Sequence, residues 1–147
     1  MIIRQGIAAD YPQLLDIWLR AVRATHHFLQ PSDIDALLPQ LRDVYFPAVE
    51  LWVAVDPDDQ PLGFIGFNEN HVEMLFVDPA HHRQGIGRAL LDFGRQSRSA
   101  MSVDVNEQNP QATAFYQRYG FVQTGRSPLD GEGRPFPLLH MSLPTRA

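Results

Sequence analysis

Residues 73–91 read EMLFVDPAHHRQGIGRALL, and this stretch decides the fold. It predicts a strand, a proline-containing loop, a turn with Gly85 and Gly87, and the start of a helix. Glycines before a helix let the backbone approach a ligand closely, and the helix start favours an anion. We therefore expect a phosphate-bearing cofactor here, although a purely structural strand-to-helix turn explains the same two glycines.

Outward from this stretch, apolar periodicity predicts strands and helices along the whole chain. Three successive strands with short turns (51–55, 62–68 and 71–77) indicate an antiparallel meander, and the strand–helix–strand crossover around the glycine turn indicates a parallel pair. Further strands are expected at 2–7, 101–105, 121–126 and 136–143, and helices at 10–25, 32–46, after Gly87, and at 110–119. We expect one domain over residues 1–147 of the α/β (α+β) class. Its mixed, mostly antiparallel sheet has about seven strands, flanked by about four helices.

Composition narrows the classes of protein that the chain represents. The 147 residues carry a formal charge of -5 and a sequence pI near 5.6, which argues against a nucleic-acid partner held by a general basic surface. The sequence has no cysteine, which excludes disulfides, thiolate catalysis and cysteine-ligated zinc. No signal peptide or membrane-spanning run is evident, so we expect no membrane association and a cytoplasmic protein.

The glycine turn does not match the common nucleotide-binding motifs. A dinucleotide-binding fingerprint needs a third glycine and a later acidic residue, and a Walker A loop needs Lys-Ser/Thr after its glycines. A second segment, NEQNPQATAFYQRYGF at residues 106–121, follows in order. Together with LFVDP and HRQGIGRALL, it makes the chain resemble the GNAT superfamily of N-acetyltransferases, and among them the small bacterial YjaB type. The resemblance runs from the first strand to the last.

The resemblance implies a GNAT fold that binds acetyl-CoA and releases CoA. The amides of residues 83–88 would hold the pyrophosphate, and the backbone of Val77 would pair with the pantetheine arm. One loop position departs from the family pattern, since His82 stands where Arg or Gln is usual, and the role of its side chain stays open. The cofactor contacts that the resemblance implies are Phe76, Val77, Arg83, Gln84, Gly85, Ile86, Gly87, Arg88, Asn109 and Tyr116.

Tyr116 matches the family position of the acid that protonates the departing thiolate. A thiol titrates near ~8.5, so a proton donor beside the sulfur assists its departure. The alternative is that Tyr116 is a core aromatic on an amphipathic helix. Tyr119 and Phe115 are expected to pack.

The base is less sharply indicated, because an alkylamine acceptor is protonated at neutral pH and several groups can take its proton. Glu73 is the first candidate, since strand alternation predicts it on the face of Val77, opposite Met74 and Phe76. The alternative is an exposed strand glutamate. Histidine titrates in the right range, so His26, His27 and His71 are rival candidates for the base. The candidates for the acceptor site are His26, His27, Phe28, His71 and Asn106.

The acceptor itself stays open among a small amine, a peptide N-terminus and a protein lysine. The adjacent His81 and His82 suggest a metal only weakly, because no third ligand is evident, and we expect none. The rival function is a non-catalytic module that binds or senses acyl-CoA. The final strand, 136–143, is a candidate for pairing across a homodimer if it lies at the edge of the sheet.

Overall fold

Seven strands form one sheet in the computed structural model, which describes residues 1–144. The order across the sheet is β1-β2-β3-β4-β5-β7-β6, and only the β4–β5 pair is parallel. The strands are β1 (Ile2–Gln5), β2 (Glu50–Val55), β3 (Pro61–Asn68), β4 (His71–Val77), β5 (Met101–Asn106), β6 (Val122–Ser127) and β7 (Leu138–Leu143). The predicted mixed, mostly antiparallel sheet and its crossover are confirmed.

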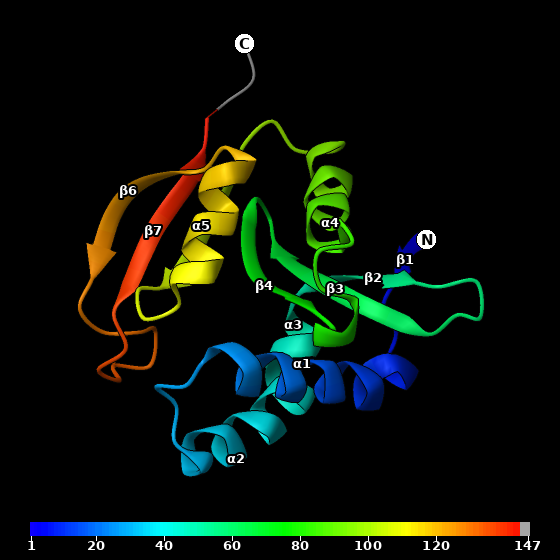
Figure 1. Ribbon diagram of the computed structural model, residues 1–147, viewed down its shortest axis with the longest axis horizontal. Helices are drawn as coiled ribbons and strands as arrows, with labels where there is room; N and C mark the ends of the chain where they lie inside the picture. The colour runs from blue at the N-terminus through cyan, green and yellow to red at the C-terminus, as the bar shows by residue number, and fades with distance from the viewer. Residues whose placement is uncertain (145–147) are drawn as a thin grey trace.

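Four helices longer than one turn flank the sheet: α1 (Tyr11–Thr25), α2 (Pro31–Gln40), α4 (Ile86–Arg95) and α5 (Pro110–Tyr119). Short segments join them: η1 (Ala8–Asp10), η2 (Leu41–Tyr45), α3 (Phe46–Ala48) and η3 (Pro79–His81). In Figure 1, α1 and α2 lie on one side of the sheet, and α4 and α5 lie on the other. The strands of the second half, β6 and β7, stand apart from the first half as a separate wing.

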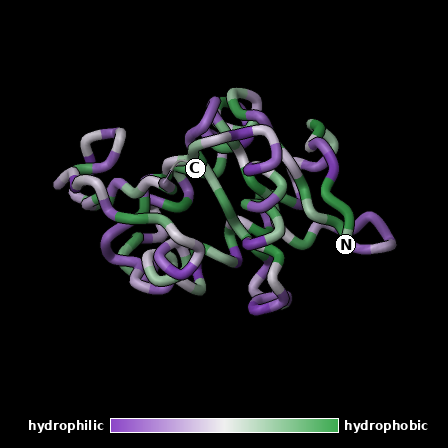
Figure 2. Tube along the Cα trace, turned by 90° about the horizontal axis from the view of Figure 1, so that it is seen from above, coloured by the Kyte–Doolittle hydropathy of each residue, from purple (hydrophilic) through white to green (hydrophobic). Residues whose placement is uncertain are grey.

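Each face of the sheet has its own apolar cluster, because strand residues alternate between the faces. On one face, Leu90 of α4 clusters with Ile65 of β3 and Val103 of β5. On the other face, Leu14 of α1 and Phe46 of α3 cluster with Phe64 of β3. Burying one such side chain stabilises the fold by roughly 1.5–3 kcal/mol. Figure 2 shows the hydrophobic colour on the inner strands and the hydrophilic colour on the connecting loops.

The sheet opens between β4 and β5, and the candidate site lies at this opening. The two parallel strands pair only at His71–Ser102 and Val72–Val103. Beyond Val72, the β5-facing edge of β4 has no strand partner among residues 1–144, since β5 continues beside β7 instead. The opening exposes backbone groups that a ligand can pair with, as an added strand does.

A β-bulge at Glu73 interrupts the alternation of β4 side chains between the two faces of the sheet. Gly66 pairs with Met74 and Phe67 pairs with Val72, so Glu73 is an extra residue with no partner on β3. Val72, Leu75 and Val77 belong to the face covered by α4, while Met74 and Phe76 belong to the α1 face. Glu73 lines a cleft with Met74 and Phe76. The predicted placement of Glu73 on the face of Val77 is therefore wrong, because alternation assumes an unbroken ladder.

The final strand β7 lies between β5 and β6, so it has no free edge for pairing across a dimer; the outer strands are β1 and β6.

The sequence also predicts that Pro39 kinks or divides the helical segment at 32–46. The chain stays helical through Pro39, but α2 ends at Gln40 and the wider turn of η2 follows, where the amide of Phe46 bonds the carbonyl of Leu41, five residues back.

No helix within residues 1–144 combines the length and the apolar character that crossing a membrane requires.

Candidate active site

The loop between η3 and α4 presents a row of free backbone amides. Arg83 and Gly85 adopt positive φ angles of 64° and 77°, which turn successive N–H groups toward the same side of the loop. Among the described residues, no acceptor bonds the amides of residues 83–88, and α4 has no side-chain cap. Residues 82–85 are exposed, so these amides face solvent at the positive end of the helix dipole. This arrangement suits a phosphate group.

Gly87 brings the start of α4 close to α5. A Cβ atom built at Gly87 would lie 3.1 Å from Cζ of Phe115 and 3.7 Å from Cγ2 of Val77. The glycine turn therefore has a packing role as well as an exposed row of backbone amides. Gly85 supplies the left-handed backbone, and Gly87 supplies the close approach, so the structural role expected of the two glycines is present.

An ion pair that is buried on its Asp78 side ties the end of β4 to α1. The carboxylate of Asp78, which is 9% exposed, accepts hydrogen bonds from the Ala80 amide and from the Arg20 guanidinium. Burial raises the pKa of Asp78, but the bonds from Arg20 and Ala80 outweigh it, so the pKa lies below its usual range. Arg20 also bonds Asp16, one turn earlier on α1. The loop is thus anchored before its free amides begin.

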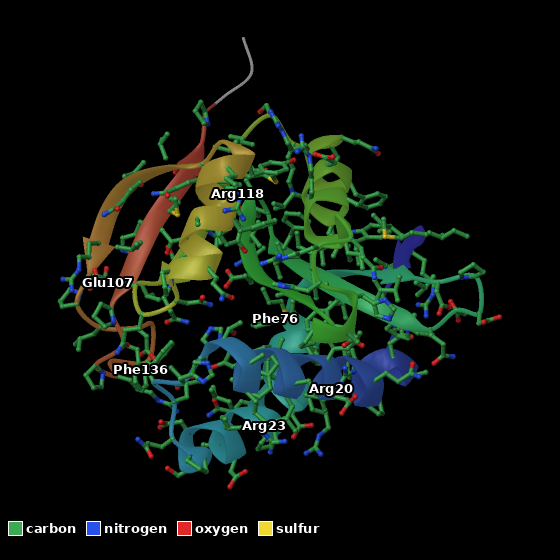
Figure 3. The ribbon with its side chains drawn as sticks, viewed as in Figure 1. Arg20, Arg23, Phe76, Glu107, Arg118 and Phe136 are labelled. Carbon is green, nitrogen blue, oxygen red and sulfur yellow. The ribbon has the colours of Figure 1, made fainter. Side chains whose placement is uncertain are left out.

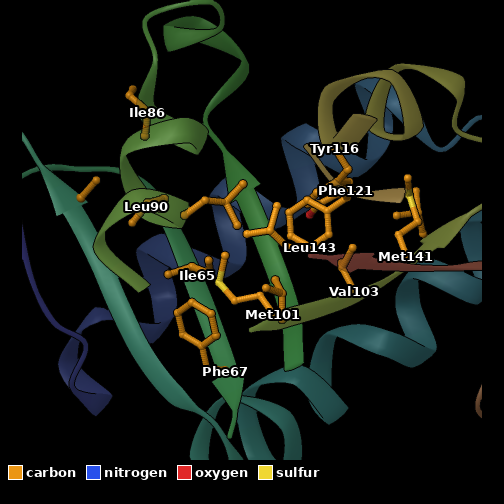
Figure 4. Close-up of a cluster of buried hydrophobic side chains, with 14 of the residues drawn as sticks. Ile65, Phe67, Ile86, Leu90, Met101, Val103, Tyr116, Phe121, Met141 and Leu143 are labelled. Atoms are coloured by element: carbon orange, nitrogen blue, oxygen red, sulfur yellow. The ribbon is translucent and has the colours of Figure 1, made fainter. Parts of the chain in front are cut away.

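Tyr116 lies on α5 within the cluster that covers the opened strands. It is 7% exposed and packs edge-on against Phe115 and Phe121, with ring centroids 5.2 Å and 5.4 Å away. Figure 4 shows it beside Phe121 and Leu143. None of the side-chain hydrogen bonds within residues 1–144 involves its hydroxyl, and burial raises the pKa of Tyr116 above its ordinary range. The hydroxyl therefore stays protonated and is free to donate.

A cleft of about 440 Å³ lies on the opposite face, between the sheet and the helices α1 and α2. Glu73 is exposed there, and its carboxylate has no ion pair or hydrogen bond to any described residue. Figure 3 shows Phe76 at the centre of the molecule, between the sheet and α1. The residues that line the cleft are Trp18, Val22, His26, Leu29, Leu37, Leu41, Tyr45, Ala48, Val49, Asn68, Glu73, Met74, Phe76 and Asn106.

A second cleft of about 270 Å³ adjoins the first and shares Asn106 and Tyr45 with it. Phe28 and Phe136 form its aromatic wall, with ring centroids 5.6 Å apart, and Figure 3 places Phe136 on the loop that faces the α1–α2 connection. The Tyr45 hydroxyl donates to the Glu132 carboxylate across this cleft, which raises the pKa of Tyr45 to about 12. The two clefts make one groove across the open end of β5.

The predicted acceptor-site histidines separate in the structure. His26 lines the first cleft against Phe76, with ring centroids 6.4 Å apart. Burial, with a smaller contribution from His27, lowers the pKa of His26 to about 4, so it is neutral at neutral pH. His27 is exposed and lines neither cleft, and His71 lies at the start of β4, against Ser102.

Two asparagines and one histidine complete the predicted set. Asn109 caps α5, since its Oδ1 accepts from the Ala112 amide at 3.2 Å, and it is 5% exposed. Asn106 lines both clefts. His82 is exposed on the loop before the free amides and has no hydrogen bond to a described side chain. In the portion described, no three His, Cys, Asp or Glu side chains are grouped to hold a metal ion.

Sequence reasoning missed the aromatic wall and a set of polar side chains on β5, β6 and β7. Alternation along MSVDVN and LLHMSL does place Asp104 and His140 on exposed faces, so a partial signal exists. Asp104 and His140 are 36 positions apart in the sequence, so no local pattern predicts their contact.

Comparisons with known proteins agree with this geometry. Residues 22–143 match the model of the acetyltransferase (GNAT) domain. The chain is 40% identical over 142 residues to the peptidyl-lysine N-acetyltransferase YjaB of Salmonella typhimurium, covering 97% of each chain. It is 39% identical over 140 residues to YjaB of Escherichia coli, covering 95% of each.

Solved structures show the same architecture. The solution structure of apo-form YjaB from Escherichia coli has a TM-score of 0.91 at 38% identity, covering 99% of this chain and 100% of that one. The PaiA N-acetyltransferase from Thermoplasma acidophilum in complex with coenzyme A has a TM-score of 0.76 at 17% identity, covering 97% of both chains. At that identity the second likeness shows the fold alone.

Proposed function

The chain belongs to the GNAT acetyltransferase family and is an acetyl-CoA-dependent N-acetyltransferase; we propose that its acceptor is the ε-amine of a lysine within a peptide or protein. The relatives that share about 40% of its residues carry the name peptidyl-lysine N-acetyltransferase. The observation that carries the proposal is the unpaired carboxylate of Glu73 in a largely apolar cleft.

The cleft suits a lysine side chain. A lysine is a four-carbon apolar stem that ends in an ammonium group, so it prefers apolar walls with an anion at the end. Trp18 and Phe76 supply apolar walls, and Glu73 supplies the anion. The bulge is what turns Glu73 into this cleft, so one irregularity in β4 creates the charge complementarity.

Glu73 acts as the base in this proposal. A lysine ammonium has an ordinary pKa near ~10.4, so the amine must lose a proton before it attacks the thioester carbonyl. The Glu73 carboxylate accepts that proton, directly or through one water. No arginine among the described residues forms an ion pair with the Glu73 carboxylate, which leaves the carboxylate available to the acceptor.

Tyr116 acts as the acid on the other side of the divided sheet. When the carbon–sulfur bond breaks, the electron pair leaves with the sulfur, and the Tyr116 hydroxyl donates its proton there. Its burial among apolar rings favours the protonated form, which suits this task.

The residues present also fit acetyl-CoA. The free amides of residues 83–88 suit its pyrophosphate, and the open edge of β4 at Phe76 and Val77 suits its amide-containing pantetheine arm. Acetyl-CoA supplies the activated acetyl group. The sequence has no cysteine, so no acyl-enzyme forms through that side chain, and the proposal has the acetyl group pass directly from acetyl-CoA to the amine.

The test is mass spectrometry of a lysine peptide with a blocked N-terminus, incubated with the protein and acetyl-CoA. The 147 residues contain no lysine, so any acetyl-lysine comes from the added peptide. We expect acetylation of the lysine, loss of turnover in Glu73→Gln, and wild-type turnover in the control Glu69→Gln in the adjacent β3–β4 turn. If the blocked peptide gains no acetyl group while a lysine-free peptide with a free N-terminus is acetylated, the lysine acceptor is wrong; full activity in Glu73→Gln would overturn the role of Glu73.

A further inference from the structure

The seam that joins the two halves of the sheet is very short. Only two residues of β4 pair with β5, and one further backbone bond runs from the Ser102 amide to the Asn70 carbonyl at 3.1 Å. Glu73 follows the last paired residue of β4, and Asn106 ends β5. The position of β4 relative to β5 therefore sets the separation of the two edges of the cleft.

Polar side chains cross this seam on the cleft face of the sheet. The His71 Nδ1 atom lies 2.7 Å from the Ser102 Oγ atom, and His71 Nε2 lies 3.4 Å from Asp104 Oδ2. The other Asp104 oxygen, Oδ1, lies 2.6 Å from His140 Nδ1, and His140 Nε2 lies 2.6 Å from Ser127 Oγ. One chain of contacts thus links β5, β4, β7 and β6.

The donors and acceptors in this chain follow from the carboxylate. An ionised carboxylate only accepts, so each histidine nitrogen that faces Asp104 carries a hydrogen. This assigns the Nε2–H form to His71 and the Nδ1–H form to His140. Their outer nitrogens accept from the hydroxyls of Ser102 and Ser127.

We propose that His71 and Asp104 are positioning residues that hold β4 at a fixed distance from β5 and so place Glu73 opposite the open end of β5. The proposal rests on the proposed function, which makes Glu73 the base. The side-chain contacts reinforce a seam that has few backbone bonds of its own. His140 contacts the other oxygen of Asp104, which restrains the carboxylate beside His71.

A positioning role fits better than an acid–base role for His71. Both of its ring nitrogens already face partners, and it does not line either cleft. Asp104 from β5 faces His71 across the seam, with His140 from β7 behind it, and Glu73, His26 and Tyr45 line the cleft on the same face of the sheet. Because the proposed role of His71 and Asp104 is only to place Glu73, their variants should keep the pH profile of the wild type.

Steady-state kinetics of His71→Ala and Asp104→Ala with acetyl-CoA and the lysine peptide test the proposal. We expect kcat/KM to fall by about tenfold or more in each, because a displacement of ~1 Å at a reacting group can cost ~100-fold. His71→Gln should recover much of the loss, since its amide can donate to Asp104 and accept from Ser102. The shape of the pH profile should stay that of the wild type. Asp58→Ala, in the exposed β2–β3 turn, is the matched control and should leave kcat/KM unchanged.

Two results would overturn the proposal. Wild-type kcat/KM in both alanine variants would show that the contacts position nothing. Equal losses in His71→Gln and His71→Ala, with a changed pH profile, would make His71 a proton carrier instead. If an alanine variant does not fold, the comparison of His71→Gln with Asp104→Asn keeps the same readouts. Failure of the proposed function is separate, since it would appear as full activity in Glu73→Gln.

Discussion

Replacing Tyr116 with phenylalanine removes one oxygen atom from the centre of the proposed chemistry. The ring keeps its edge-on contacts with Phe115 and Phe121, and the lost hydroxyl has no hydrogen-bond partner among the described side chains. The free energy of unfolding should therefore change by less than about 1 kcal/mol. The variant should fold, and its activity then reports the chemical role of the hydroxyl alone.

The expected loss is in kcat. Proton transfer by a positioned side chain contributes about 100-fold or more, which corresponds to about 2.7 kcal/mol of barrier height. Because burial raises the pKa of Tyr116, the hydroxyl remains a donor from neutral to mildly alkaline pH. The loss in the variant should be the same across that range, since ionisation of the tyrosine does not set in there.

A thiol-reactive dye measures the reaction directly, because the sequence has no cysteine and only released CoA reacts. Tyr119→Phe is the matched control. It removes the same atom one turn later on α5, where the hydroxyl donates to Asp92 at 2.6 Å. The control should lose about 1 kcal/mol of stability and keep its kcat. A kcat in Tyr116→Phe within twofold of the wild type, about 0.4 kcal/mol, would refute the role of Tyr116 as acid.

Three further predictions concern single groups. His26 should show no titration above about pH 5 in NMR spectra of its ring, because burial lowers its pKa to about 4. Asp78→Asn should lower the free energy of unfolding at neutral pH by about 1–3 kcal/mol. This difference should shrink as acid protonates the wild-type carboxylate, whose folded pKa lies below its usual value, and thermal unfolding against pH measures it. Gly94→Ala should cost about 1–3 kcal/mol, because its Cβ would lie 2.2 Å from Cζ of the buried Phe67; Gly131→Ala, which meets no atom within 4 Å, is the control.

Local sequence patterns were sufficient for most of the architecture. The positive φ at Gly85 and the cap at Asn109 are local features with strong residue preferences, so the loop and the start of α5 were predictable. The predicted range 71–77 matches β4 from end to end. The parallel seam between β4 and β5 also followed, because a strand–helix–strand crossover requires it.

The cleft was less predictable because it depends on contacts across the sheet. The bulge at Glu73 arises from the register of β3 against β4, which alternation in one strand does not contain. The aromatic contact of Phe28 with Phe136 and the bond of Asp104 with His140 join distant segments. The sequence motifs therefore predicted individual residues for the cofactor side and only candidate positions for the acceptor side.

The most direct test of the account is an NMR titration of the ¹⁵N-labelled protein with CoA. We propose that the pyrophosphate binds the free amides of residues 83–88 and that the pantetheine arm lies along the open edge of β4. The largest chemical-shift changes should therefore fall at these amides and at Phe76 and Val77. Shifts confined to the second cleft, at Asp130 and Glu132, with the loop amides unmoved, would contradict it.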